Sequence, residues 1–339
     1  MVGAVIVRGD EVVGEGLHRR RGGPHAEIFA LRQAGPAARG ATMYVTLEPC
    51  AHKGRSGPCA DAIVEAGLAR VVVAQRDPYH EVRGRGLRRL RDAGIEVSLG
   101  DGAAEAGALN TAWLRVQKAG RPFVALKYAA TLDGKTAARS GDSRWITGAP
   151  ARAETHRLRR AYDAIAVGAG TVIADDPQLN SRDAAGAPFG RQPLRVVVDG
   201  RLLTDPRARV HAPALGGGSV VLAARSAAAA RLARFRAAGV DVEVLNATAP
   251  SGAELLAALG RRGVASVLVE GGGELAWSLV REGLVDRVYA FFGPLLIGGR
   301  TAASPVGGEG FERLAEALRL DVVNVRRLGP DVLLEAVAA

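Results

Sequence analysis

The chain has 339 residues, more than one hydrophobic core usually organises, so two domains are expected. Hydrophobic residues make up 48% of it, yet no apolar run reaches the roughly 18 residues of a membrane helix and the start lacks a secretory signal, so we expect a cytoplasmic protein with no membrane partner. The formal charge of +10 comes mostly from arginines dispersed along the chain, which disfavours a nucleic-acid-binding face.

The first hundred or so residues alternate short β-rich runs with helical patterns, as a layered α/β sheet does. Strands are expected over 2–8, 11–16, 42–47, 70–75 and 95–99, and helices from about residue 25, from residue 59, over 85–93 and over 103–118. Gly120-Arg121-Pro122 then interrupts the pattern, so we expect one domain over 1–119 and another over 120–339.

The second part restarts the same alternation and contains no repeat of the first. Strands are expected over 123–129, 164–168, 194–199, 219–223, 240–245, 266–270, 287–292 and 331–335, and helices over 151–162, 231–238, 253–261 and 275–282. It is therefore also predicted to be an α/β domain.

A candidate metal site lies in the first domain. His25 and Glu27 open an expected helix, Cys50 follows an expected strand, and Cys59 begins the next helix. One imidazole and two thiolates suit zinc and leave its fourth tetrahedral position to water, while Glu27 can move that water's proton to a leaving amine. A helix cap and two buried thiols are the alternative interpretation. Zinc deaminases of bases carry H-x-E followed by P-C-x-x-C, and here H-A-E precedes P-C-x8-C, which favours a deaminase.

The longer loop indicates a subgroup. Residues 46–59, TLEPCAHKGRSGPC, resemble a segment of the riboflavin-pathway deaminases, and His18, Pro24 and His25 to Glu27 match that family too. The resemblance implies a cytidine-deaminase-like three-layer α/β fold, with His18 at the pyrimidine substrate and Arg55 beside its phosphate. Ser56 and Gly57 depart from the family's usual Thr-Pro.

The start of the chain departs further from that family. Its members have a helix and then Asn-Pro-x-Val-Gly, whereas Met1 here precedes Val2-Gly3 directly, so the Asn that contacts the substrate base is missing. Either the true start lies upstream or the deaminase half is compromised. We expect the former.

Four segments of the second domain resemble the reductase of the same pathway, whose fold is similar to dihydrofolate reductase: residues 127–135, 141–147, 168–182 and 269–273. A Rossmann dehydrogenase is disfavoured because Gly168-x-Gly170 is not followed by a third glycine at Ile173. The resemblance implies NADPH contacts from Ala129, Trp145, Thr171, Asp175, Gly271, Gly272 and Gly273. It implies substrate contacts from Ser143, Arg159, Leu179, Arg182 and Glu270.

Lys127 is singled out by its position. A lysine on a central strand among Ala, Leu and Tyr is expensive to bury without a partner, so we expect it to face the site and polarise the sugar, with Asp175 or Glu270 as counter-charge. For Arg159, on an Arg-rich helix, a solvated face is the alternative to substrate binding.

The resemblance therefore implies a bifunctional enzyme of riboflavin biosynthesis. Zinc would serve the deamination of a diaminopyrimidinone ribosylamino phosphate, and NADPH would then reduce its ribosyl group to ribityl, with catalysis by Glu27 and Lys127. We also expect a homo-oligomer. The alternatives are a reductase with a compromised deaminase domain and a nucleic-acid base deaminase with an appended domain.

Overall fold

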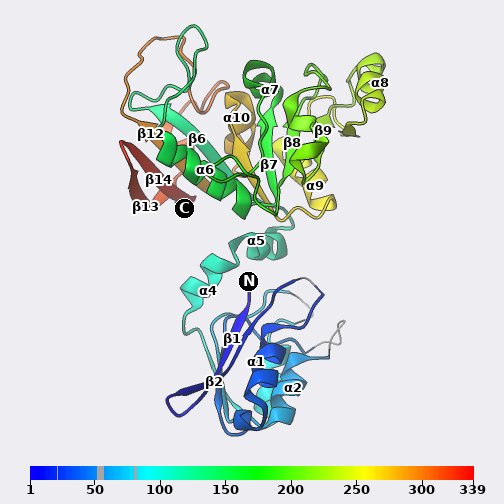
Figure 1. Cartoon of the computed structure of the whole chain (residues 1–339), viewed down its shortest axis with the longest axis vertical. Coiled ribbons are helices and arrows are strands. Elements are labelled where there is room, and N and C mark those ends of the chain that lie inside the picture. The colour runs from blue at the N-terminus through cyan, green and yellow to red at the C-terminus, as the bar shows by residue number, and fades with distance from the viewer. Residues whose placement is uncertain (21, 52–56, 80–81) are drawn as a thin grey trace. The chain divides into compact units, whose positions relative to one another are not determined.

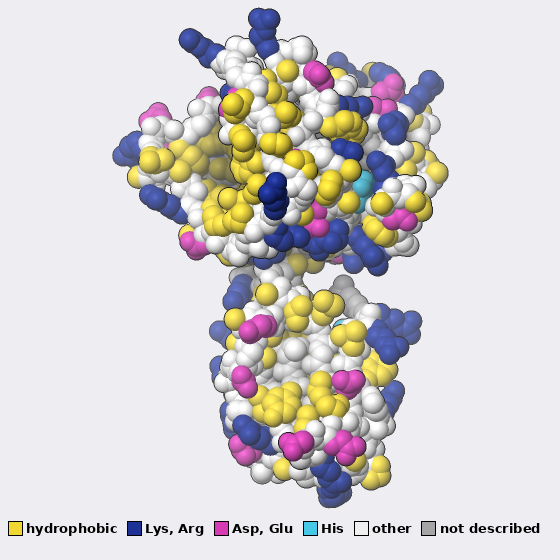
Figure 2. Space-filling model, turned by 60° about the vertical axis from the view of Figure 1, so that its left-hand side comes forward, with side chains coloured by type: hydrophobic (Ala, Val, Ile, Leu, Met, Phe, Trp, Pro, Cys, Tyr) yellow, Lys and Arg dark blue, Asp and Glu magenta, His cyan; other side chains and the backbone are white. Residues whose placement is uncertain are grey.

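The structure is a computed structural model that describes residues 1–20, 22–51, 57–79 and 82–339. The chain divides into two compact α/β units, Met1–Gly120 and Arg121–Ala339, and each contains its own large hydrophobic core. Within the described ranges, no helix combines the length and the apolar character needed to cross a membrane. Acidic side chains are interspersed with basic ones over both units on the face shown in Figure 2.

The first unit is built on a five-stranded sheet, counted over the described residues, in the order β2-β1-β3-β4-β5. Its strands are β1 (Gly3–Arg8), β2 (Glu11–Leu17), β3 (Thr42–Val45), β4 (Arg70–Val73) and β5 (Glu96–Leu99). β1 runs antiparallel to β2 and β3, whereas β3, β4 and β5 are mutually parallel. The carboxyl ends of β3 and β4 therefore lie at the same edge of the sheet.

The helices of this unit are α1 (Ala26–Ala34), α2 (Cys59–Ala66), α3 (Arg85–Asp92), α4 (Ala103–Leu109) and α5 (Thr111–Ala119). Alternate strand residues such as Ile6, Met43 and Val71 are fully buried against residues of α1, α2 and α3 in one core cluster. The period of two in the strands supplies one apolar face, and the helices cover it.

The second unit is built on a nine-stranded sheet, again within the described residues, in the order β10-β9-β8-β7-β11-β6-β12-β14-β13 (Figure 1). Its strands are β6 (Phe123–Thr131), β7 (Ala164–Gly168), β8 (Leu194–Val198), β9 (Ser219–Ala223), β10 (Asp241–Val244), β11 (Ser266–Glu270), β12 (Arg287–Gly293), β13 (Leu320–Leu328) and β14 (Asp331–Ala338). The first seven strands in this order, which end with β12, are parallel to their neighbours. β14 is antiparallel to both β12 and β13. The carboxyl ends of β6, β7 and β11 thus meet at one edge.

Five α-helices accompany these strands in the described part of the second unit: α6 (Ala149–Ala161), α7 (Ala169–Asp175), α8 (Ala229–Ala237), α9 (Gly252–Arg261) and α10 (Gly273–Arg281). The central strand β11 is buried along its whole length, and its valines pack with leucines of α9 and α10 in the main core. A parallel strand that is covered on both faces has a continuous run of apolar residues, and β11 has such a run just before Glu270.

Three expectations about the elements were wrong. The single helix expected over 103–118 is two helices, because the Asn110 side chain donates to the Ala106 carbonyl and so competes with helical bonding. The short helix α7 and the strand β13 were not predicted. β13 forms because its backbone pairs with β14, which a strand of mixed polarity does not reveal in sequence.

Candidate active sites

The three candidate metal ligands lie together in the first unit. His25 is the residue before α1, Cys50 follows β3, and Cys59 is the first residue of α2. Nδ1 of His25 lies 3.2 Å from Cys59 Sγ and 3.5 Å from Cys50 Sγ, and one ligand atom from each residue lies within 4.8 Å of the others. Both cysteines are buried, near the carboxyl edge of the sheet.

Two glycines of β2 bring α1 and its histidine to this place. A Cβ on Gly16 would lie 1.8 Å from the Ala26 carbonyl oxygen, and one on Gly14 would lie 2.3 Å from that of Ala30. Only glycine permits so close an approach of helix and strand backbones. Neither glycine was predicted to have this role.

The pKa values of the two cysteines shift in opposite directions. The Cys59 thiol donates to Cys50, which lowers the pKa of Cys50 to about 4, whereas the adjacent Cys50 and burial raise the pKa of Cys59. A divalent cation between them would favour ionisation of both sulfurs. One neutral imidazole and two thiolates within bonding reach of a common point are a donor set that fits zinc.

Glu27 lies on the first turn of α1, two residues beyond His25, and is only 3% exposed. Its Oε2 atom is buried and has no hydrogen-bond partner among the described residues. Burial raises the pKa of this carboxyl group. A free, desolvated carboxylate oxygen beside three zinc-type ligands is the arrangement that a proton-transfer group requires.

His18 borders the same site. Its Nδ1 lies 3.0 Å from the Pro24 carbonyl oxygen, and its ring meets that of His25 edge to face at a centroid distance of 5.2 Å. Arg55, the residue expected beside the phosphate, lies outside the described residues.

In the second unit, Lys127, Arg159 and Glu270 form a charged cluster. Lys127 and Glu270 are direct neighbours on β6 and β11, and Lys127 Nζ lies 3.9 Å from Glu270 Oε2. Arg159 of α6 donates to both Glu270 oxygens, at 2.7 and 2.9 Å, and to the Asn180 carbonyl. Of the two acids expected opposite Lys127, the structure therefore pairs it with Glu270. Arg159 is 15% exposed at its side chain, so it does not lie on a solvated face.

The cluster contains two basic side chains and one acidic side chain. Burial lowers the pKa of Lys127 even though Glu270 opposes this, and Arg159 lowers it further. For Glu270, burial is outweighed by Arg159 and Lys127, so its pKa lies below the usual value. Two cations thus share one buried carboxylate, which leaves positive charge for an anionic or electron-rich ligand.

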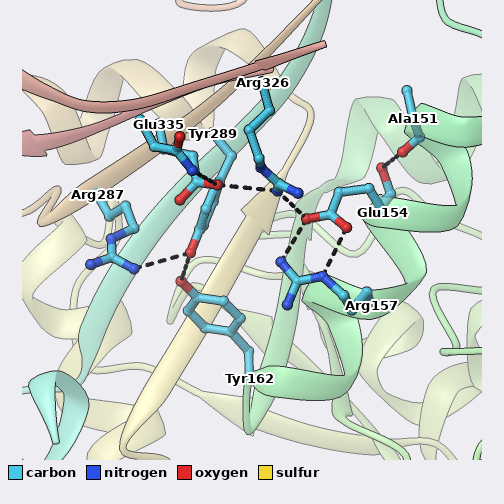
Figure 3. Close-up of polar contacts among 10 residues, drawn as sticks. Ala151, Glu154, Arg157, Tyr162, Arg287, Tyr289, Arg326 and Glu335 are labelled. Atoms are coloured by element: carbon cyan, nitrogen blue, oxygen red, sulfur yellow. Dashed lines mark hydrogen bonds and ion pairs between the residues drawn. The ribbon is translucent and has the colours of Figure 1, made fainter. Parts of the chain in front are cut away.

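A second polar network connects α6 to strands of the sheet (Figure 3). Arg326 of β13 donates to Glu154 of α6 at 2.5 Å and to Glu335 of β14 at 3.2 Å, and Arg157 binds Glu154 with two hydrogen bonds. Nearby, the hydroxyl of Tyr162 donates to that of Tyr289 at 3.2 Å. These contacts fix the helix from which Arg159 reaches Glu270.

The segment after α7 lies against the cluster. Leu179 is 3% exposed with a φ of 54°, and Arg182 donates to Gln178 at 2.8 Å and to the Asn180 side chain at 3.3 Å. His156 of α6 hydrogen-bonds to the backbone of Asn180. Burial, Arg159 and Arg182 lower the pKa of His156 to about 4. His156 was not predicted as a site residue, although its place one helical turn before Arg159 indicates the same face of α6.

The glycine turn Gly271 to Gly273 links β11 to α10 and is enclosed on two sides. A Cβ on Gly271 would lie 3.2 Å from Thr171 Oγ1, and one on Gly273 would lie 2.9 Å from the backbone nitrogen of Gly307. Gly271 and Gly272 have φ values of 75° and 84°. The turn therefore needs glycine, and its backbone can approach a diphosphate at the start of α10.

The loop that carries Ser143 and Trp145 makes two close contacts with the rest of the second unit. Arg144 donates to the carbonyl of Asp175 at 2.9 Å, and a Cβ on Gly293 of β12 would lie 1.9 Å from the Ile146 oxygen. Trp145 is 67% exposed, with the Arg152 guanidinium 4.5 Å from its ring centroid. Ala129 lies toward the carboxyl end of β6, opposite Phe291 of β12.

Comparisons with known proteins cover both units. A family profile described as RibD C-terminal domain matches residues 122–334, and one described as cytidine and deoxycytidylate deaminase zinc-binding region matches residues 1–75. The riboflavin biosynthesis protein RibD of Actinobacillus pleuropneumoniae is 41% identical over 339 residues, which are 99% of this chain and 89% of that protein. RibD of Escherichia coli K12 is 41% identical over 356 residues, covering 100% of this chain and 93% of that protein.

Solved structures agree with these relatives. RibD of Acinetobacter baumannii superposes with a TM-score of 0.85 at 38% identity, covering 100% of this chain and 92% of that one. A diaminohydroxyphosphoribosylaminopyrimidine deaminase/5-amino-6-(5-phosphoribosylamino)uracil reductase of Thermotoga maritima superposes with a TM-score of 0.84 at 35% identity and the same coverage.

Proposed function

This chain belongs to the RibD family of riboflavin biosynthesis proteins, a deaminase joined to a reductase, and from that premise we propose which residues perform each step. The expected fold class, a cytidine-deaminase-like domain followed by the reductase domain of this family, is confirmed. We propose as substrate a diaminopyrimidinone ribosylamino phosphate, since the names of the relatives describe a phosphoribosylaminopyrimidine.

In the deaminase unit, His25, Cys50 and Cys59 would hold zinc, which when bound supplies a Lewis acid that activates water. Glu27 accepts a proton from the attacking water at its free Oε2 while the water oxygen bonds to the amine-bearing carbon, and it passes that proton to the departing amine. The carbon–nitrogen bond then breaks, ammonia leaves, and the remaining water proton moves to the ring nitrogen beside the new carbonyl. His18 would contact the pyrimidine, and Arg55, which lies outside the described residues, is the expected partner of its phosphate. The observation that carries this assignment is the free Glu27 oxygen beside the three ligands.

In the reductase unit, Lys127 polarises the opened ribose and Glu270 fixes its ammonium group in place. Arg182 and Arg159 hold the ribose phosphate. Arg159 has five N–H donors, of which three serve Glu270 and Asn180, so two are left for substrate. Ser143 and Leu179 complete the substrate site.

We propose NADPH as the cofactor of this unit, where it would supply hydride to C1 of the sugar. Its contacts would come from Ala129, Trp145, Thr171, Asp175 and the turn Gly271 to Gly273. The enclosed glycine turn and the exposed indole of Trp145 support this assignment. Comparing KM for NADPH with KM for NADH tests the preference for the phosphorylated cofactor.

A homo-oligomer is also proposed. The edge strand β13 exposes Val322, Val323 and Val325 at 57%, 55% and 60%, and within the described residues β14 is its one strand neighbour. Exposed valines on a strand at the edge of a sheet favour association with a second copy of the chain. Light scattering of the wild type and of Val325→Asp tests this, and a monomeric wild type would contradict it.

Ammonia release and NADPH oxidation, measured separately on purified full-length protein, test the two assignments. Glu27→Gln should abolish ammonia release and leave NADPH oxidation with deaminated substrate intact, while Lys127→Met should do the reverse. A wild type that oxidises NADPH but releases no ammonia would identify a reductase with a compromised deaminase domain.

A further inference from the structure

Glu48 is a second buried acid near the metal ligands, two residues before Cys50. It is 3% exposed, and each of its carboxylate oxygens accepts two backbone N–H groups. Oε2 accepts from Asp77 at 3.3 Å and Gly84 at 3.0 Å, and Oε1 accepts from Gly86 at 3.1 Å and Leu87 at 3.3 Å. All four donors lie between 29 and 39 residues further along the chain.

These bonds replace a local helix cap. The N-cap residue of α3 is Gly84, which provides no side-chain cap, and α3 has no acidic residue in its first turn. The carboxylate of Glu48 satisfies N–H groups that the helix leaves unpaired and places a negative charge at its positive end. The start of α3 is therefore tied to the strand-to-loop segment that carries Cys50.

Two further contacts connect this tie to the metal ligands. A Cβ on Gly86 would lie 1.8 Å from the carbonyl oxygen of Pro49, so the first turn of α3 rests on the peptide group next to Cys50. Tyr79 and Val82, just before α3, pack with Cys50 and Cys59 in one small cluster. A shift of α3 away from Glu48 would displace both the backbone of Cys50 and the wall behind the two sulfurs.

We propose that Glu48 is a positioning residue that fixes Cys50 for zinc binding and takes no part in proton transfer. Its oxygens are fully occupied by backbone donors, in contrast to Oε2 of Glu27. Groups that orient metal ligands without touching the metal commonly change affinity by about 10- to 100-fold when removed. The inference rests on the zinc site of the proposed function.

The test uses zinc-loaded, full-length Glu48→Gln, in which the amide nitrogen has to face backbone N–H donors. Zinc release to a chromogenic chelator should become at least about tenfold faster than in wild type, and the absorption bands of the cobalt-substituted protein should shift. Glu65→Gln, on the exposed face of α2, is the matched control and should behave as wild type. Unchanged zinc release and an unchanged cobalt spectrum in Glu48→Gln would overturn the proposal.

Two other variants cover the case that Glu48→Gln fails to fold. Gly86→Ala keeps the Glu48 carboxylate but forces the start of α3 to move away from Pro49. Glu48→Asp keeps the negative charge on a side chain that is one methylene shorter. Both should accelerate zinc release, Glu48→Asp less than Gly86→Ala, and wild-type release from both would overturn the proposal. Because zinc release needs no substrate, a wild type without deaminase activity would refute the proposed function and leave this measurement decisive for Glu48.

Discussion

Buried charges at the two sites differ in how their hydrogen-bonding capacity is used. Glu270 is surrounded by cations, Glu48 by backbone N–H groups, and Glu27 keeps an oxygen without a partner among the described residues. A buried acid with all its acceptors filled holds structure together, whereas one with a free oxygen can exchange a proton. This distinction assigns different roles to residues of the same type.

Replacing Glu270 should destabilise the second unit strongly. Glu270→Gln leaves Lys127 and Arg159 buried without a counter-charge, and breaking a buried ion pair in this way costs about 3–5 kcal/mol. The free energy of unfolding from denaturant titration measures this. Glu316→Gln removes an exposed pair with Arg313 and should cost less than about 1 kcal/mol. Equal effects of the two substitutions would contradict the interpretation.

His156 should make the stability of the second unit depend on pH. Its pKa in the folded chain is lowered to about 4 from the ordinary 6.5. Between about pH 6.5 and pH 4, His156 is protonated in the unfolded chain but not in the folded chain. The free energy of unfolding should therefore fall as the pH is lowered through this range. His156→Gln keeps a donor for the Asn180 backbone and should show a smaller fall in denaturant midpoint. Identical pH profiles of variant and wild type would exclude His156 as the cause.

At the scale of elements, glycines and side-chain caps decide how closely a helix approaches a strand. α1 lies against β2 at Gly14 and Gly16, and α3 lies against Pro49 at Gly86. In both places the backbone contact brings a ligand-bearing segment to the carboxyl edge of the sheet. Most element boundaries follow the alternating pattern because apolar period and length are local properties. β13 instead depends on backbone pairing with the adjacent strand β14, which its own side-chain pattern does not indicate.

Gly16→Ala should loosen the deaminase unit. Its Cβ would lie 1.8 Å from the Ala26 carbonyl, so α1 has to move, at a cost of about 1–3 kcal/mol or more. We expect lower stability of the first unit and slower ammonia release, with NADPH oxidation unchanged. Gly107→Ala, on α4 where a Cβ meets nothing closer than 3.9 Å, should be neutral or stabilising, and destabilisation of similar size there would argue against a specific contact at Gly16.

On the scale of the whole molecule, each of the two units has its own large hydrophobic core and its own candidate site. Metal binding should therefore stabilise the first unit alone. Chelation should remove about 2.7 kcal/mol of stability where free zinc had been 100 times its Kd. Calorimetry should show one transition shifted downward while NADPH oxidation with deaminated substrate persists. Loss of both activities on chelation would show that the units depend on one another.

Short-range information in the sequence predicted the candidate metal ligands and the class of both domains. His25, Glu27, Cys50 and Cys59 lie within 35 residues, and a helix start and a strand end suffice to bring such motifs together. The resemblance extended this to NADPH and to the substrate residues, most of which remain predictions, and Arg55 lies outside the described residues.

Which charges compensate one another and which backbones touch follows from the folded arrangement alone. Arg159 and Glu270 are 111 residues apart, and Glu48 reaches N–H groups up to 39 residues away. From the sequence, Lys127 has two possible counter-charges and Arg159 two possible environments, because side-chain pairing depends on strand order and register. Parallel pairing of β11 with β6 settles both, since it sets Glu270 beside Lys127 within reach of α6.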